Sequence, residues 1–334
     1  MPKPRTVVVT GGSAGVGRAT ARAFARLGWN VALIARGRER LEAACAEMTE
    51  AGAAGVLAIS ADVADADAVF AAARQVLDGF GGMDVWVNNA MATVLGAVSQ
   101  ISPAEVRRVT EVTYLGGVHG TMAALRHMQP RDAGTIVQIG STLAYRAIPL
   151  QSAYCGAKFA LRGFTDSLRS ELIYAGSAVR LTMVHLPAVN TPQFDWARNH
   201  MPHRPRPVAP VFTPEAVAEH IRDAALQAPR EIWVGGPTVQ GILGQFVGPG
   251  MLDRYMAHTA HDGQMSEEPK PMAPDNLFEP APGNQAADGR FAGEAQHHVR
   301  AFNPTALRVA GAVLGAGAVG GASLLGRRLL RGRR

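Results

Sequence analysis

The feature that most constrains the fold is a glycine-rich turn between a short apolar run and a helical pattern near the start of the chain. Thr6–Thr10 is short, β-branched and unbroken, as in a buried parallel strand. The turn TGGSAGVG follows, and then the helical pattern RATARAFARLG. Strand, glycine turn and helix together are typical of a dinucleotide site, whose phosphates lie on the helix N-terminus. The predicted cofactor-binding residues of this turn are Gly11, Ser13, Gly15, Val16 and Gly17.

Further apolar runs alternate with helical patterns along the next 220 or so residues. This alternation predicts an α/β fold with a doubly wound parallel sheet. In such a sheet, ligands bind beyond the carboxyl ends of the strands. The predicted strands after the first are Asn30–Ala35, Val56–Ser60, Met83–Val87, Thr135–Ile139, Val179–His185 and Glu231–Val234.

The end of the second strand bears on the choice of cofactor. An NAD site usually has Asp or Glu there to hold the ribose 2′-hydroxyl, but this chain has Ala35 followed by Arg36. A guanidinium in place of a carboxylate suits a 2′-phosphate, which favours NADP over NAD. Arg38 and Arg40 follow closely. The alternative is that Arg36 and these two arginines belong to a solvated helix start at Arg38–Thr49.

The third strand is followed by Asp62 and Val63. The acid can bind the adenine amino group, or it can cap a helix over Ala66–Phe80, and both roles are compatible.

Ser141, Tyr154 and Lys158 form the candidate catalytic group. Tyr154 and Lys158 are four residues apart, so on a helix their side chains share one face. An ammonium beside a phenol favours the phenolate and lowers its pKa. Ser141 follows the apolar run TIVQI, where its hydroxyl can meet a carbonyl oxygen that Tyr154 also reaches, as general acid–base chemistry on a C–O bond requires. The same Tyr–Lys spacing also occurs as an ordinary pair on a helix surface.

Taken in order, these motifs show a resemblance. With Asn88-Asn89-Ala90 and the LPAVNT segment, residues 4 to about 240 resemble the short-chain dehydrogenase/reductase family. The resemblance implies a Rossmann fold, interconversion of a carbonyl and an alcohol with NAD(P), and a homo-oligomer, either dimer or tetramer. It implies that Tyr154 is the acid/base, that Ser141 orients the substrate oxygen, and that Lys158 holds the nicotinamide ribose and lowers the pKa of Tyr154. The further cofactor-binding residues that it implies are Asp62, Val63, Asn89, Ala90, Tyr154, Lys158, Pro187 and Thr191.

Three positions depart from the family pattern. Thr113 stands where the family often has an asparagine that organises a water relay from the lysine, so we expect Thr113 to hold a backbone carbonyl in place instead. Met91 replaces a glycine and narrows the floor of the pocket. Ala188 replaces the glycine of the usual Pro-Gly pair. None of the three removes the acid/base group.

Charge and cysteine content narrow the class of protein. The net charge is +6, but five arginines lie within the last eight residues, so a nucleic-acid-binding core is not implied. Cys45 and Cys155 have neither metal-site nor disulfide-framework spacing, which fits the reducing cytoplasm. No signal peptide precedes the first strand. His200 and His203 lack the partners of a metal site, so we predict no metal.

The connection over residues 192–210 is long enough to be a lid over the site, with apolar side chains and with arginines that we interpret as solvated. Its apolar side chains favour a hydrophobic alcohol or ketone as the substrate.

The sequence predicts a catalytic domain at 1–256 and an extended, largely irregular tail at 257–304. We expect few buried contacts in this tail, so that a chain ending near Tyr255 would still fold; Leu277 and Phe278 are candidates for docking on the core.

The last segment, 305–334, is apolar and rich in Gly and Ala, and its end is rich in Arg. Residues 309–325 are uncharged and near the lower length limit for a membrane span. Three hypotheses stay open for this end: attachment to a membrane surface or re-entry into it, which we favour, a single membrane span, and a disordered tail.

Two other functions compete with the enzyme. The first is a dinucleotide sensor that kept the fold and lost the chemistry, which the intact Ser141, Tyr154 and Lys158 argue against. The second is a membrane-surface scaffold whose function lies in the tail. Activity of the core without its tail would separate the scaffold from the enzyme.

Overall fold

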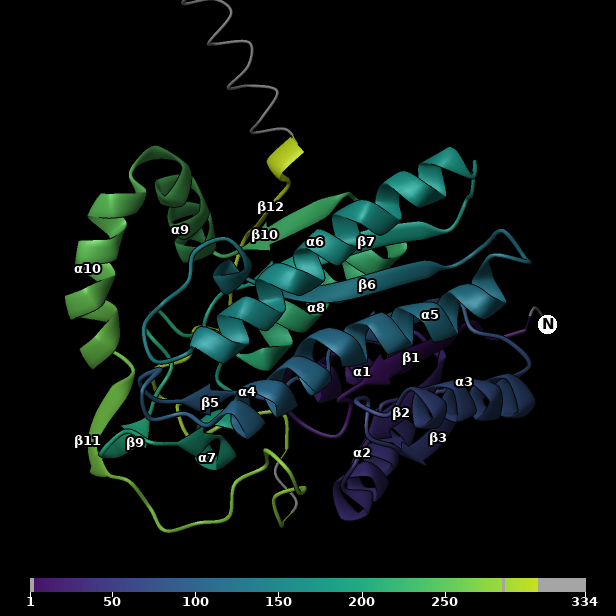
Figure 1. The fold of residues 1–334 in the computed structure, drawn as a ribbon. Helices are drawn as coiled ribbons and strands as arrows, with labels where there is room; N and C mark the ends of the chain where they lie inside the picture. The colour runs from purple at the N-terminus through teal and green to yellow at the C-terminus, as the bar shows by residue number, and fades with distance from the viewer. Residues whose placement is uncertain (1–2, 284–285, 306–334) are drawn as a thin grey trace, which may run out of the picture.

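The computed structural model describes residues 3–283 and 286–305, and it is built on one eight-stranded sheet (Figure 1). The strand order is β12-β10-β7-β6-β4-β1-β2-β3, and every neighbouring pair is parallel except β10 with β12. The α/β doubly wound parallel sheet is therefore confirmed. Its strands are β1 (Thr6–Thr10), β2 (Asn30–Ala35), β3 (Gly55–Ser60), β4 (Val85–Asn88), β6 (Thr135–Ser141), β7 (Arg180–Leu186), β10 (Glu231–Val234) and β12 (Ala301–Phe302).

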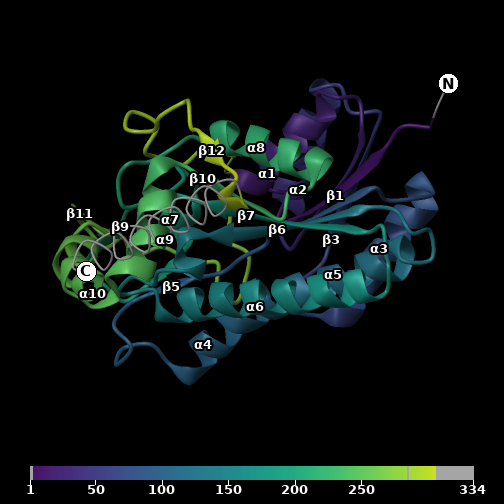
Figure 2. The same ribbon diagram turned by 90° about the horizontal axis from the view of Figure 1, so that it is seen from above.

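Helices cover both faces of the sheet, as Figure 2 shows from above. One layer consists of α1 (Gly15–Ala25), α2 (Arg38–Glu50) and α8 (Pro214–Gln227), and the other of α3 (Ala66–Phe80), α4 (Pro103–Thr110), α5 (Gly116–Met128) and α6 (Ser152–Tyr174). A separate apolar core lies under each layer. Phe24 and Leu41 belong to the first core, and Trp86 and Met128 belong to the second. Because both faces are covered, the strands read as continuous apolar runs.

The predicted strands are all present, with ends that differ by up to two residues. One difference matters for the site, because β6 continues to Ser141 and carries that residue as its last. The helix-cap role considered for Asp62 is wrong. Helix α3 is capped by Asp65, whose side chain accepts from the Ala68 amide, whereas Asp62 accepts from the Ala64 amide at 3.0 Å.

The connection over 192–210 is more ordered than a simple loop. It contains α7 (Gln193–Trp196), β8 (Arg198–Asn199) and β9 (His203–Pro205). Strand β8 pairs with β5 (Val94–Leu95), and β9 pairs with β11 (Met265–Pro269).

The sequence suggested that the arginines of this connection are solvated, but the structure shows them paired with acidic side chains. They form ion pairs: Arg198 with Glu105 and Asp275, Arg204 with Asp195 and Glu268, and Arg206 with Glu294.

After β10 the chain forms a helical hairpin, α9 (Gly236–Val247) and α10 (Pro249–Asp262), beside the carboxyl ends of the strands (Figure 1). The residues after 262 have few regular elements, yet they pack onto the domain. Leu277 is fully buried in the second core, and β12 adds an antiparallel strand to the sheet edge. The expectation of few buried contacts beyond residue 257 is therefore wrong, because the main chain of this segment supplies hydrogen bonds that its polar sequence does not reveal.

Among residues 3–283 and 286–305, no helix combines the length and the apolar character needed to cross a membrane. The apolar run 309–325 and the arginine-rich end lie outside the described residues, so the hypothesis of surface attachment stays untested.

Candidate active site

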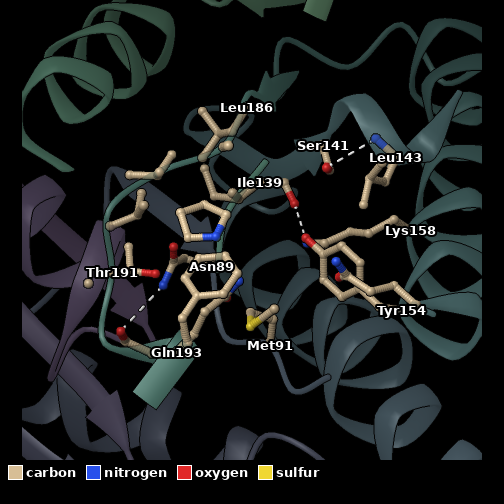
Figure 3. A pocket seen from close by; sticks show the side chains of 18 of the residues that line it. Asn89, Met91, Ile139, Ser141, Leu143, Tyr154, Lys158, Leu186, Thr191 and Gln193 are labelled. Carbon is tan, nitrogen blue, oxygen red and sulfur yellow. Dashed lines mark hydrogen bonds between the residues drawn. The ribbon is translucent and has the colours of Figure 1, made fainter. Parts of the chain in front are cut away.

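A cavity of about 580 Å³ lies at the carboxyl ends of the parallel strands. Its walls come from the glycine-rich turn, the ends of β2, β4, β6 and β7, the 192–210 connection, and the hairpin α9–α10. The volume is in the range of sites for small molecules and cofactors. The three predicted catalytic residues Ser141, Tyr154 and Lys158 all line it (Figure 3).

Ser141, Tyr154 and Lys158 are placed by two adjoining elements. Ser141 ends strand β6, and its Oγ accepts a hydrogen bond from the Leu143 amide at 3.1 Å (Figure 3). Tyr154 and Lys158 lie in the first two turns of α6, which packs against β6. Their separation of four residues puts both side chains on the face that borders the cavity. The predicted grouping is therefore present.

The ammonium of Lys158 is not bonded to the phenol. Its Nζ donates to the Ile139 carbonyl at 2.6 Å and lies 5.6 Å from the centroid of the Tyr154 ring. Burial lowers the pKa of Lys158 to about 8. Burial also raises the pKa of Tyr154, and a hydrogen bond with Ser141 offsets that rise only in part. In this structure the environment favours the neutral phenol, whereas the sequence suggested a lowered pKa.

Thr113 lies behind the cavity instead of in its wall. It is fully buried in a π-helical turn, Glu111–Leu115, between α4 and α5. Its hydroxyl donates to the Ala92 carbonyl and accepts from the Ala92 amide, both at 2.9 Å. The side chain thus fixes the main chain at Ala92. The preceding residue, Met91, lines the cavity. π-Helical turns are frequent at functional sites, but the hydroxyl of Thr113 is already engaged.

The glycine-rich turn fits a pyrophosphate. Gly15 has φ +55°, a conformation that glycine adopts without strain. A Cβ on Gly17 would lie 2.3 Å from the Gly11 carbonyl oxygen, so only glycine allows helix α1 this close to the turn. Helix α1 has no side-chain cap and no acidic residue in its first turn. Anions are stabilised at such an N-terminus.

The other predicted cofactor residues surround the same cavity. The side-chain amide of Asn89 donates to the carbonyls of Thr10 and Gly11 and so ties the end of β4 to the turn. Asp62 is paired with Arg108. The predicted residues that line the cavity are Gly11, Ser13, Gly15, Val16, Arg36, Asp62, Val63, Asn89, Ala90, Pro187 and Thr191, whereas Gly17 and Thr113 do not.

Arg36 borders the cavity, but its guanidinium is already engaged. It donates to the main-chain carbonyls of Asn276, Leu277 and Phe278. Burial lowers its pKa, and the nearby Asp62 opposes that effect. Arg40 borders the cavity as well, and it donates to the carbonyl of Ala281.

The sequence reasoning missed part of the lining. Leu252, Tyr255 and Met256 of α10, with Gln240 and Gly241 of α9, border the cavity, and so do Asn276 and Pro280. The signal that could have revealed the hairpin is a helical pattern after the last parallel strand, with Pro237 and Pro249 in the first turns of the two helices. Asn276 and Pro280 lie in a polar stretch that gives no comparable signal.

Comparisons with known proteins show which family the chain resembles. Residues 5–201 match the family described as short chain dehydrogenase. The uncharacterized oxidoreductase YxnA of Bacillus subtilis is 32% identical, over 80% of this chain and 75% of that protein. The dehydrogenase/reductase SDR family member 7B of Bos taurus is 37% identical, over 50% of this chain and 53% of that protein.

Among solved structures, an alcohol dehydrogenase from the archaeon Thermococcus sibiricus, complexed with 5-hydroxy-NADP, superposes with a TM-score of 0.59. It is 29% identical, and the match covers 69% of this chain and 96% of that one. The chain belongs to the short-chain dehydrogenase/reductase family, and it is an NAD(P)-dependent oxidoreductase of that family.

Proposed function

We propose that this short-chain dehydrogenase/reductase is an NADP-dependent enzyme that interconverts a hydrophobic ketone and its secondary alcohol, with Tyr154 as the acid/base. The observation that carries the proposal is the meeting of Ser141, Tyr154 and Lys158 in one cavity that also contains the glycine-rich turn. A bound nicotinamide would supply or accept the hydride. The chain would provide the proton, the orientation of the oxygen and a cavity that limits water.

The proton chemistry follows from the local environment. The raised pKa of Tyr154 keeps its hydroxyl protonated near neutral pH, so the group is ready to donate to the oxygen of a ketone. Ser141, which borders the cavity at the end of β6, would hold that same oxygen. The neutral phenol is the form that carbonyl reduction requires, whereas alcohol oxidation requires the phenolate, and Ser141 would hold the oxygen in both directions.

Three observations support NADP as the cofactor. Strand β2 ends at Ala35, which cannot accept from a ribose hydroxyl through its side chain. Arg36 and Arg40 border the cavity just beyond that strand. Asp62, the acid with the strongest electrostatic effect on Arg36, is paired with Arg108. The alcohol dehydrogenase from Thermococcus sibiricus, whose title names a 5-hydroxy-NADP complex, adds support from a relative.

The substrate end of the cavity is largely apolar. The side chains there come from Met91, Leu143 and Ile148 on the sheet side, and from Leu252 and Met256 on α10. Transfer of apolar surface from water to such walls is favourable by about 25 cal/mol per Å². We therefore expect binding to strengthen along a series of ketones with longer or bulkier apolar groups.

A panel assay tests the function directly. Purified full-length protein is incubated with ketones of increasing apolar size and either NADPH or NADH, and loss of the reduced nicotinamide absorbance is followed. We expect turnover with NADPH that improves with apolar size. Binding of NADPH without turnover of any ketone, or of any alcohol with NADP⁺, would instead favour the dinucleotide sensor.

We also propose a homo-oligomer, dimer or tetramer. Helices α4, α5 and α6 share one face of the sheet and leave the apolar side chains of Val106, Met122 and Phe159 exposed by 37–46%. A second copy of the same face would cover them. Light scattering after size exclusion would give the mass of a monomer if the proposal is wrong.

We propose a cytoplasmic location, because both described cysteines, Cys45 and Cys155, are free thiols and the cofactor is a metabolic dinucleotide. Membrane attachment through the C-terminal residues forms no part of the proposed function.

A further inference from the structure

A segment distant in sequence borders the adenosine end of the cofactor cavity. Arg36 donates to the carbonyls of Asn276, Leu277 and Phe278, and Arg108 donates to that of Leu277 at 3.0 Å. Arg36 also borders the cavity, as do Asn276 and Pro280 themselves. The side chain of Leu277 is fully buried among residues of the second core. The segment is therefore anchored by main-chain hydrogen bonds and by one apolar side chain.

The same part of the chain continues along the rest of the cofactor site. The Gly15 amide, at the N-terminus of α1, donates to the Ala286 carbonyl at 3.3 Å. The Gly289 amide donates to the carbonyl of Asn190, next to Thr191, which lines the cavity. The Asn190 side chain in turn accepts from the amide of Phe291 at 2.9 Å. We call residues 276–283 and 286–291 the outer wall.

The outer wall contacts the three regions expected to hold the cofactor. It meets Arg36 at the adenosine end, Gly15 at the pyrophosphate turn and Asn190 beside the nicotinamide end. Most of these bonds use carbonyl oxygens of the wall, so they do not depend on its side chains. The carbonyls accept from Nη1 and Nη2 of Arg36, and none of these bonds uses its Nε, which a 2′-phosphate could still meet.

We propose that the outer wall is part of the cofactor site: it encloses the adenosine half of a bound nicotinamide dinucleotide and must separate from Arg36 and Gly15 before the dinucleotide dissociates. This inference rests on the proposed function, because it requires that the cavity binds a nicotinamide dinucleotide. It adds a region that the glycine-rich turn and the Tyr–Lys pair do not indicate. It predicts slow exchange of the cofactor, limited by movement of the wall.

A disulfide between the wall and the domain provides the test. A Cβ on Gly37 would lie 3.6 Å from the Cβ of Pro280, within the range of disulfide bonds. The full-length double variant Gly37→Cys/Pro280→Cys is loaded with NADPH in its reduced form and then oxidised. Release of NADPH into excess NADP⁺ is followed by nicotinamide fluorescence. The single variant Pro280→Cys, treated identically, controls for oxidation of Cys45 and Cys155.

We expect oxidation to slow NADPH release from the double variant by at least about tenfold, because the disulfide would keep the outer wall from separating from the domain. A reductant should restore the rate. Equal rates in the oxidised and reduced forms would overturn the inference while leaving the proposed function intact. Failure of the two thiols to pair would overturn it as well, since Pro280 would then not lie beside Gly37. Failure of the wild-type protein to bind either NADPH or NADH would overturn the proposed function itself.

A second pair of variants tests the wall in the opposite direction. A Cβ on Gly289 would lie 2.5 Å from the Thr191 carbonyl oxygen, so Gly289→Val should push the wall away from the domain. A Cβ on Gly293 would meet nothing within 4 Å, which makes Gly293→Val the matched control. We expect faster NADPH release from Gly289→Val and an unchanged rate for Gly293→Val. Equal release rates for the two variants would contradict the inference.

Discussion

Lys158 is tied to strand β6 through the main chain of Ile139: its Nζ lies 2.6 Å from the carbonyl oxygen of Ile139. The ammonium is fully enclosed, and its burial lowers the pKa to about 8 from a usual value of 10.5. The hydrogen bond fixes where the ammonium sits relative to the end of β6, where Ser141 lies. Lys158 therefore links α6 to β6, the strand that ends at Ser141.

The lowered pKa of Lys158 has a consequence for stability. Between pH 8 and 10.5 the unfolded chain binds the lysine proton more often than the folded protein does, so the folded state gains stability as pH rises. We expect this gain to disappear in Lys158→Met. Between pH 7.5 and 9.5, the free energy of unfolding of wild-type protein should rise by about 2 kcal/mol relative to the variant.

Urea unfolding of the cofactor-free proteins at the two pH values measures this effect. Lys270→Met is the matched control, because Lys270 is exposed and its removal should leave the pH dependence unchanged. If wild type and Lys158→Met show parallel pH dependence, the lysine is not held at a lowered pKa.

The second prediction concerns the acid/base group. Tyr154→Phe keeps the aromatic ring and removes only the hydroxyl that titrates. We expect turnover to fall by about 10²- to 10⁴-fold, the usual contribution of a positioned acid or base, while NADPH binds nearly as in wild type. Turnover and fluorescence titration with NADPH are measured on the same samples. A variant that turns over within a few-fold of wild type would remove Tyr154 from the mechanism.

Local patterns were enough to predict the parallel sheet and its helices. Strand β1 has the predicted bounds, because an unbroken β-branched run is a strong local signal. The docking of the 257–304 stretch was predictable only in part: of the two candidates for docking, Leu277 is buried, whereas Phe278 is 43% exposed. The hydrogen bonds of this stretch come from main-chain carbonyls, and the sequence does not mark which carbonyls will meet Arg36.

The site was predictable as a set of residues but only in part as a set of interactions. The order of the motifs brought Ser141, Tyr154 and Lys158 together, because the carboxyl ends of parallel strands share one edge. Spacing could not show that Lys158 bonds to Ile139, or that burial outweighs the hydrogen bond with Ser141 in setting the pKa of Tyr154. Desolvation depends on all of the neighbouring elements, which a spacing of four residues does not describe.

The third prediction concerns cofactor choice. Arg36→Ala removes the guanidinium at the end of β2, and we expect it to lower the preference for NADPH over NADH by about ten- to hundredfold, the effect of one charge-assisted hydrogen bond. The ratio of the two dissociation constants, measured by fluorescence titration, reports it. Arg38→Ala is the control, since Arg38 is exposed and does not line the cavity. An unchanged ratio in Arg36→Ala would assign the preference to another group.

The last prediction concerns Leu277, whose side chain is fully buried although the surrounding sequence reads as an irregular tail. Leu277→Ala leaves a cavity next to the second core, and we expect it to lower the free energy of unfolding by about 2–5 kcal/mol. Leu243→Ala makes the same chemical change at a side chain that is 46% exposed, so its effect should be within about 0.5 kcal/mol.

A chain ending at residue 256 loses Leu277, strand β12 and the carbonyl partners of Arg36 together, so it should be destabilised more than Leu277→Ala. Urea unfolding of the four proteins tests this order. If the shortened chain were as stable as wild type, residues 257–305 would contribute nothing to the fold despite their buried contacts.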